Sequence, residues 1–94
     1  MKTIHKYPVP MAGAFSLRLP KEAVILSFQC QKGVPCIWVV VETAHINEDR
    51  KFRLYGTGNP IERIPEDRIL HYIGTTQQSQ VPPLVWHLFE EAKK

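Results

Sequence analysis

Two short segments carry the residue types best suited to holding a ligand. The first contains Arg53 and the glycine-rich stretch that begins at Tyr55, and glycines after a strand let the backbone approach a phosphate closely. The second is the aromatic pair Trp86-His87, which can stack on a base while a cation contacts phosphate. We therefore expect a ligand-binding site composed of Arg53, Tyr55, Gly56, Thr57, Gly58, Asn59, Trp86 and His87.

The strand that holds Arg53 is expected to extend this surface with Arg50 and Lys51 on the same outward face. Under this hypothesis Arg53→Ala abolishes binding and leaves the melting temperature nearly unchanged. The alternative is that the basic residues only make an edge strand soluble and that Trp86 belongs to the core.

Patterns typical of catalysis or metal binding are missing from the sequence. The glycine-rich stretch has neither the third glycine of a dinucleotide fingerprint nor the Gly-Lys-Ser/Thr of a P-loop. The four histidines have no metal-ligand spacing with one another or with a cysteine. We expect no catalytic residues, no metal and no cofactor, and hence a protein that is not an enzyme; the histidines are His5, His45, His71 and His87.

Alternating apolar and polar residues predict most of the strands. The period of two is clear at residues 15–19, 24–31 and 51–55. Residues 36–43 are apolar on both faces through Val41, so we expect this strand to lie centrally, covered on both sides, with Trp38 in the core. Further strands are expected at residues 3–7, 69–75 and 85–89.

The connecting segments are predicted less sharply. Residues 61–68 can be a loop or a helical turn, residues 76–83 read as a polar loop, and residues 90–94 as a frayed tail or single helical turn. Cys30 and Cys36 flank a turn and can face each other across a hairpin, although reduced thiols are expected. The whole predicts one domain, residues 1–94, of all-β class: a small antiparallel barrel or sandwich of about six or seven strands.

Composition sets the broad class. The chain has 94 residues, 44% of them hydrophobic, and a formal net charge of +3. That charge is well below the density of a dedicated DNA-binding arm. No apolar segment follows the basic start and none is long enough to cross a bilayer, so we expect a cytoplasmic protein. A core this small makes a homo-oligomer a natural way to bury more surface.

The ordered set of motifs resembles a family of short bacteriophage and prophage proteins, a domain of unknown function. The resemblance covers nearly the whole chain and implies a phage origin, but it supplies no catalytic residues. The motifs are Lys-Tyr-Pro near the start, Ile25-Leu26, Gln29-Cys30-Gln31, residues 35–38, Arg53, residues 55–58, residues 72–75 and residues 85–90.

Three functions follow from these expectations. The first is a small binding protein that inhibits host defence by sequestering an anionic, nucleotide-like ligand or a host protein. The second is a structural or assembly protein of a phage particle. The third is a single-strand nucleic-acid binder, which the modest charge does not favour.

Overall fold

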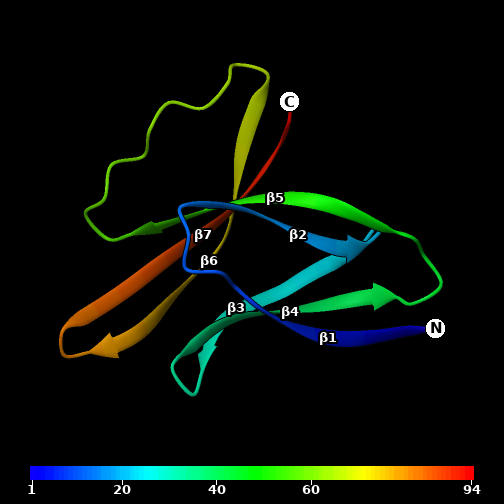
Figure 1. Ribbon diagram of the computed structural model, residues 1–94, viewed down its shortest axis with the longest axis horizontal. Coiled ribbons are helices and arrows are strands. Elements are labelled where there is room, and N and C mark those ends of the chain that lie inside the picture. Colours follow the sequence, from blue (N-terminus) through cyan, green and yellow to red (C-terminus); the bar gives the residue numbers. More distant parts are fainter.

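A computed structural model describes residues 1–94 and contains seven β-strands and no helix. The strands pair antiparallel in two sheets, a three-stranded sheet in the order β1-β4-β3 and a four-stranded sheet in the order β2-β5-β7-β6. Figure 1 shows how they are arranged. Their bounds are β1 Lys2–Pro8, β2 Ala14–Pro20, β3 Val24–Gln31, β4 Val34–Glu42, β5 Asn47–Gly56, β6 Arg68–Gln80 and β7 Pro83–Lys93.

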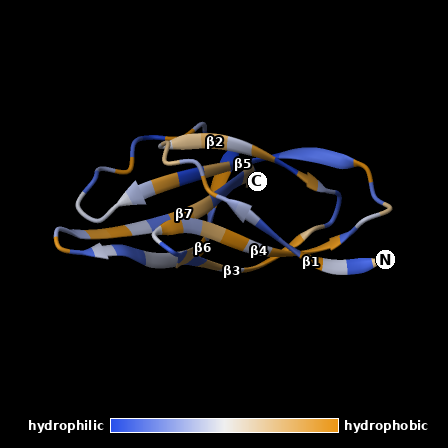
Figure 2. Ribbon diagram, turned by 60° about the horizontal axis from the view of Figure 1, so that its bottom comes forward, coloured by the Kyte–Doolittle hydropathy of each residue, from blue (hydrophilic) through white to orange (hydrophobic).

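The two sheets form a sandwich that is not closed into a barrel. The view in Figure 2 places β2 and β5 in one layer and β1, β3 and β4 in the other. The sheets meet along β3 and β6, where the backbone N–H of Cys30 donates to Thr76 Oγ1 at 3.0 Å. At the same place a Cβ on Gly74 would lie 3.3 Å from Cβ of Phe28, so β6 approaches β3 closely.

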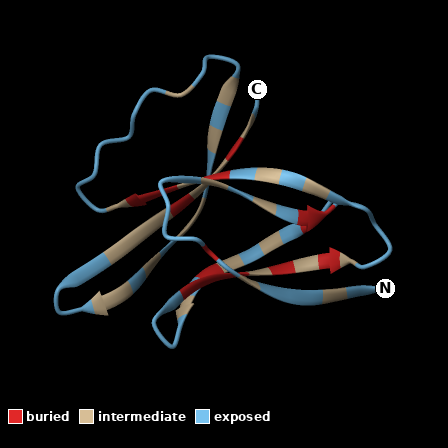
Figure 3. Cartoon of the chain, viewed as in Figure 1, coloured by how far each residue is buried: buried red, intermediate tan, exposed pale blue.

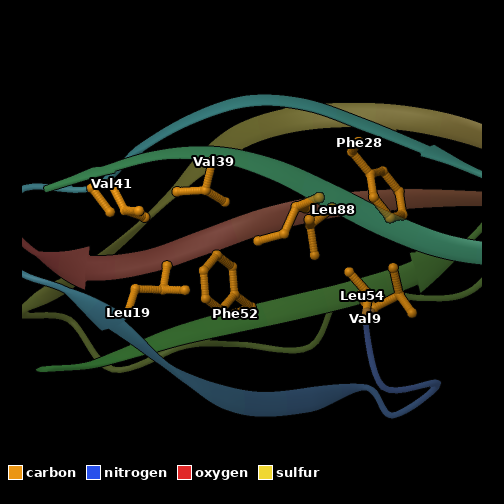
Figure 4. Close-up of a cluster of buried hydrophobic side chains, with 10 residues drawn as sticks. Val9, Leu19, Phe28, Val39, Val41, Phe52, Leu54 and Leu88 are labelled. Carbon is orange, nitrogen blue, oxygen red and sulfur yellow. The ribbon is translucent and has the colours of Figure 1, made fainter. Parts of the chain in front are cut away.

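The core lies between β4 of one sheet and β5 and β7 of the other. In Figure 4 the side chains of Val39, Phe52 and Leu88 point toward one another from these strands, and all three are essentially inaccessible to solvent. Val9, in the connection between β1 and β2, also belongs to this core. Its backbone N–H donates to the carbonyl of Pro35 at 2.9 Å, so the connection is fixed to β4.

Strand β4 is central in its sheet, as predicted, but from Trp38 onward only one of its faces is fully covered. Ile37, Val39 and Val41 are buried in the core. Successive side chains in a strand point to opposite faces, so Trp38 and Val40 face away from the other sheet, and both are partly exposed. The prediction that Trp38 lies in the core is therefore wrong, because an apolar run alone does not show that both faces are covered.

Other differences concern the ends of strands. Strand β6 continues through the polar residues 76–80, and β7 continues to Lys93 without a helical turn. Residues 61–67 form no strand or helix, and Figure 3 shows the β5–β6 connection exposed along nearly all of its length.

Both cysteines are free. Cys36 lies opposite Gln29 and Cys30 lies opposite Pro35, so the two thiols point to opposite faces of the sheet and cannot cross-link the hairpin.

Candidate functional site

The glycine-rich stretch forms the turn that ends β5. The backbone N–H of Asn59 donates to the carbonyl of Gly56 at 3.0 Å, and that of Thr57 donates to the carbonyl of Val85 at 3.1 Å. Gly58 has a φ of +90°, a left-handed conformation that glycine adopts without steric cost. The turn is therefore fixed to the first residues of β7.

A cavity of about 370 Å³ lies between this turn and β7, and four of the predicted site residues line it. They come together because Gly56 on β5 lies directly opposite Trp86 on β7. Sequence reasoning missed the other three, which belong to the start of β7, because only the pairing of β5 with β7 places them beside the turn. The lining consists of Gly56, Thr57, Asn59, Trp86, Pro83, Leu84 and Val85, none of which carries a charge.

The indole ring of Trp86 is held in place from two sides. Its Nε1–H donates to Gln78 Oε1 at 2.8 Å. A Cβ on Gly56 would lie 3.2 Å from Cζ3 of Trp86 and 3.3 Å from Nδ2 of Asn59, so the ring and the Asn59 amide sit where any other residue at position 56 would crowd them. The ring also packs against the core. The cavity thus has a rigid apolar wall beside one polar amide.

Tyr55 and His87 lie on the opposite face of the four-stranded sheet from Trp86, since residues alternate along each strand. Tyr55 is only 6% exposed, and its ring contacts the edge of Phe89 at a centroid distance of 5.8 Å. Its hydroxyl is buried without a hydrogen-bond partner. Burial raises the pKa of Tyr55, and the negative charge of Glu62 adds to the effect. Tyr55 is a packed residue here and offers no surface to a ligand at the cavity.

Arg53 lies on this same face and is already paired with two carboxylates. Its Nε donates to Glu91 Oε1 at 2.9 Å, and its Nη1 donates to Glu62 Oε1 at 2.8 Å. The side chain of Glu91 is only 7% exposed. Burial opposes the charge of Arg53, yet the hydrogen bond and charge of Glu91 outweigh it and raise the pKa of Arg53. The structure thus balances the charge that the sequence suggested for an anionic ligand.

The other arginines are paired in the same way. The sequence predicted that Arg50 shares an outward face with Arg53, and this prediction is wrong. Arg50 points to the opposite side of the sheet and forms two hydrogen bonds to Glu90. Each of the five arginines lies within 4.0 Å of a carboxylate. The excess positive charge of the chain therefore belongs to its lysines.

His87 is held by hydroxyl groups on both sides. Its Nε2 lies 2.8 Å from Thr57 Oγ1, and its Nδ1 lies 3.0 Å from Thr75 Oγ1. Thr75 Oγ1 in turn lies 2.7 Å from the Tyr72 hydroxyl. The Thr57–His87 distance is that of a nucleophile and its base, but the group that orients the imidazole is a hydroxyl and not the carboxylate of a hydrolase triad. Sequence reasoning missed Thr75 and Tyr72, which only the β6–β7 pairing brings to His87.

No group of three or more His, Cys, Asp or Glu side chains is arranged to hold a metal ion. The structure also contains no helix long and apolar enough to cross a membrane.

Comparison with known proteins gives one match. A model of a domain of unknown function, DUF7352, matches residues 1–94. Neither a curated protein nor a solved structure matches the chain.

Proposed function

The chain belongs to the DUF7352 family, domains of unknown function, and we propose that it is a non-catalytic binding protein whose site is the cavity beside Trp86. The observation that carries this proposal is the lining of that cavity. Its volume of about 370 Å³ falls in the range of small-molecule sites, which are concave, mostly apolar and provided with a few placed polar groups.

The lining favours a flat, uncharged ring as the ligand. The Trp86 indole is held by Gln78 and by contact with Gly56, so a ring that stacks on it orders no further side chain there. The Asn59 amide supplies both a donor and an acceptor, which suits the polar edge of a nucleobase. Stacking of a base on an aromatic side chain is worth about 1–3 kcal/mol.

The cavity lining supports binding of the base of the nucleotide-like ligand expected from sequence, but it does not support binding of a phosphate. No residue of the lining is a cation, and Arg53 is occupied by Glu62 and Glu91 on the other face of the sheet. A host protein as partner, inhibition of host defence and a phage origin remain part of the hypothesis and rest on the sequence resemblance. A cytoplasmic location also remains part of the hypothesis, and it rests on the expectation that no apolar segment of the sequence is long enough to cross a bilayer.

Single-strand nucleic-acid binding is supported less. Proteins of that kind line a groove with unpaired cations and stacking rings. Here every arginine has a carboxylate partner, and the net charge is only +3.

Titration with adenosine and with adenosine monophosphate, followed by amide and indole NMR shifts, tests the proposal. We expect adenosine to shift the Trp86 indole N–H signal and the monophosphate to bind within about threefold of it, since the cavity offers no charge. Trp86→Ala should weaken binding by about 5- to 150-fold, the loss of one stacking contact. The matched control is Trp38→Ala, on the other sheet, which should bind normally, and both ligands should be recovered unchanged.

Two results would overturn the proposal. One is the absence of any shift at the cavity with millimolar adenosine, cytidine and guanosine. The other is monophosphate binding that is tenfold tighter than adenosine binding and is lost in high salt, because that pattern belongs to an anion site elsewhere on the molecule.

A further inference from the structure

The outward face of the three-stranded sheet carries a row of apolar side chains. Val40 on the central strand β4 lies between Ile4 of β1 and Val24 of β3 in the register, and directly opposed residues point to the same side. Trp38 and Val34 point to this side as well, because successive side chains of β4 alternate between its two faces. We call the apolar side chains Ile4, Val24, Val34, Trp38 and Val40 the β4 face.

The β4 face is open to solvent. Ile4 is 56% exposed, Val24 57% and Val34 46%, and Leu26 in the bulge of β3 is 53% exposed beside them. Exposed aliphatic side chains that lie next to one another on one face indicate a binding surface. The other outward residues of β3 are polar and carry no charge, namely Ser27, Gln29 and Gln31.

Lysines without a carboxylate partner border the β4 face at both ends. Lys6 and Lys32 border a hollow where β4 begins, and Lys2 and Lys21 border a second hollow where β4 ends. None of these four lysines has a carboxylate within 4.0 Å. Lys6 donates instead to the side-chain amide oxygen of Gln31 at 2.6 Å. Both ends of the β4 face therefore attract anions.

The acidic groups at the second hollow do not cancel this charge. Glu42 pairs with the N-terminal amine and accepts a hydrogen bond from the backbone N–H of Ala44 at 3.1 Å. Glu22 also borders a hollow of the four-stranded sheet. The imidazole of His45 lies with Nδ1 2.8 Å from the carbonyl oxygen of Lys21. The ends of the β4 face thus hold four lysines and the N-terminal amine, but only two glutamates.

The rest of the molecule is nearly neutral. The four-stranded sheet, the β5–β6 connection and the chain end hold seven acidic residues against five arginines and three lysines. Most of the formal net charge of +3 therefore surrounds the β4 face. The seven acidic residues are Glu48, Asp49, Glu62, Glu66, Asp67, Glu90 and Glu91.

The kind of charge and the kind of apolar residue indicate the partner. Interfaces between proteins are enriched in arginine and depleted of lysine, whereas lysines carry the charge around the β4 face. Sites for single-stranded nucleic acid present a series of stacking rings, whereas Trp38 is the only aromatic member of the β4 face. Both observations disfavour a protein or a nucleic acid as the partner.

An anionic lipid surface matches all of these features. Tryptophan concentrates at membrane interfaces, and aliphatic side chains can reach the boundary between headgroups and acyl chains. Lysines around them reach headgroup phosphates on long, flexible stems. The molecule is thin, 16 Å along its shortest axis against 42 and 36 Å along the other two, so a broad sheet face can lie flat on a bilayer.

We propose that the β4 face docks on the surface of a phospholipid bilayer rich in anionic headgroups. Trp38, Val40 and Ile4 enter the headgroup region, and the lysines at the two ends of the face contact lipid phosphates. The cavity beside Trp86 belongs to the other sheet, so this inference does not rest on the proposed function, and adenosine binding should be the same with and without vesicles.

Co-sedimentation with phospholipid vesicles tests the proposal. Binding should be at least about tenfold tighter to phosphatidylcholine vesicles that contain about 30% phosphatidylserine than to phosphatidylcholine alone, and about 0.5 M NaCl should remove most of this difference. Lys2→Gln and Lys6→Gln should each weaken binding by about fivefold, the contribution of one lysine near an anionic surface. Ile4→Ser and Val24→Ser should each weaken it by a similar factor of about five, through the loss of apolar contact.

Two variants serve as matched controls. Lys51→Gln removes the same charge from the four-stranded sheet, and Val81→Ser removes an apolar side chain that is 89% exposed on the β6–β7 turn. Both should bind vesicles like the wild type. All of these substitutions are at exposed residues, so the fold should be kept, which circular dichroism checks.

The fluorescence of Trp38 locates the contact. In a Trp86→Phe background its emission should shift to the blue when phosphatidylserine vesicles are added, because the indole leaves water. An emission maximum that does not change would contradict docking through this face, even if the chain sediments with the vesicles.

Other results would also overturn the proposal. They are no binding at about 1 mM phosphatidylserine-containing lipid, equal binding to phosphatidylcholine alone, and equal losses in the control variants. Tighter binding to oligothymidylate or to polyglutamate than to vesicles, weakened by the same β4-face substitutions, would assign the face to a nucleic acid or an acidic protein instead.

Discussion

Replacing Arg53 with alanine should destabilise the fold and leave the cavity beside Trp86 able to bind. This is the reverse of the expectation from sequence, in which Arg53 contacts the ligand. The reason is the position of Glu91, whose side chain is 7% exposed and lies 2.8 Å from Arg53 Nη2. Without the guanidinium, a carboxylate remains in a site where water reaches it poorly.

The size of the effect follows from the contacts that remain. Removing one partner of a buried ion pair costs about 3–5 kcal/mol. Arg68 still approaches Glu91 at 4.0 Å, and Glu62 is 59% exposed and regains water, so we expect a cost at or just below the bottom of this range, about 2–3 kcal/mol. For a chain of this length that loss lowers the melting temperature by about 10–20 °C.

Urea unfolding followed by tryptophan fluorescence, at one fixed protein concentration, measures the loss as a shift of the midpoint. Arg63→Ala is the matched control, because Arg63 is 88% exposed and pairs only with Glu66 at 3.6 Å. Its cost should stay below about 0.5 kcal/mol. Replacing Arg53 with Met and Glu91 with Leu together should recover much of the stability, since no charge is then left buried.

The opposite outcome would refute this reasoning. If the free energy of unfolding of the Arg53→Ala variant lies within about 0.5 kcal/mol of the wild-type value, and the variant no longer binds adenosine, the Arg53–Glu91 pair contributes little to the stability of the fold. Arg53 would then have to be returned to the ligand site, as the sequence pattern had indicated.

Two further predictions concern residues around the site. Tyr55→Phe removes a hydroxyl that is buried without a partner, so we expect stability at pH 7 to be unchanged or up to about 1 kcal/mol higher. Because burial raises the pKa of Tyr55, the folded state keeps the phenol protonated to a higher pH than the unfolded state does. The stability linked to this difference is fully present below the unfolded pKa of about 10 and is lost as the pH rises through the folded pKa. The Tyr55→Phe variant should lack this alkaline loss of stability, which urea titrations at pH 9–12 measure. Gly56→Ala adds a Cβ 3.2 Å from Cζ3 of Trp86, so the indole ring should move and its N–H signal in the NMR spectrum should shift. Adenosine binding should weaken by about tenfold, which corresponds to the partial loss of one stacking contact. An unchanged spectrum would contradict the close packing of the ring.

Alternation along the chain was sufficient to predict two of the strands that contribute to the core, β2 and β5. Residues 15–19 and 51–55 show one apolar and one polar face, and both lie in strands whose apolar residues, such as Leu19 and Phe52, are buried. The polar part of β6, residues 76–80, could not be predicted in this way. It pairs with β7 in a hairpin arm where neither face is fully buried, so no hydrophobic period marks it.

The site was predictable only in part, for a similar reason. The glycine turn and Trp86 came together because β5 and β7 pair with Gly56 opposite Trp86, and residue types alone suggested both. The partners of Arg53 were not predictable, since Glu62 lies in an irregular loop and Glu91 near the end of the chain. Their charges can be matched to Arg53 only after the fold is known.

The connection between β1 and β2 plays a larger part than its irregular backbone suggests. The edge strands of the two sheets are β1 and β3 in one and β2 and β6 in the other. The sheets are joined where β3 meets β6, so the opposite edge of the sandwich, between β1 and β2, is its open side. The β1–β2 connection crosses this open edge, and the side chain of Val9, only 4% exposed, packs there against the core. Tolerance to substitution should therefore differ sharply within these five residues. Exposed positions are free to vary, namely Met11, Ala12 and Gly13, whereas position 9 has to remain apolar to keep water out of the core.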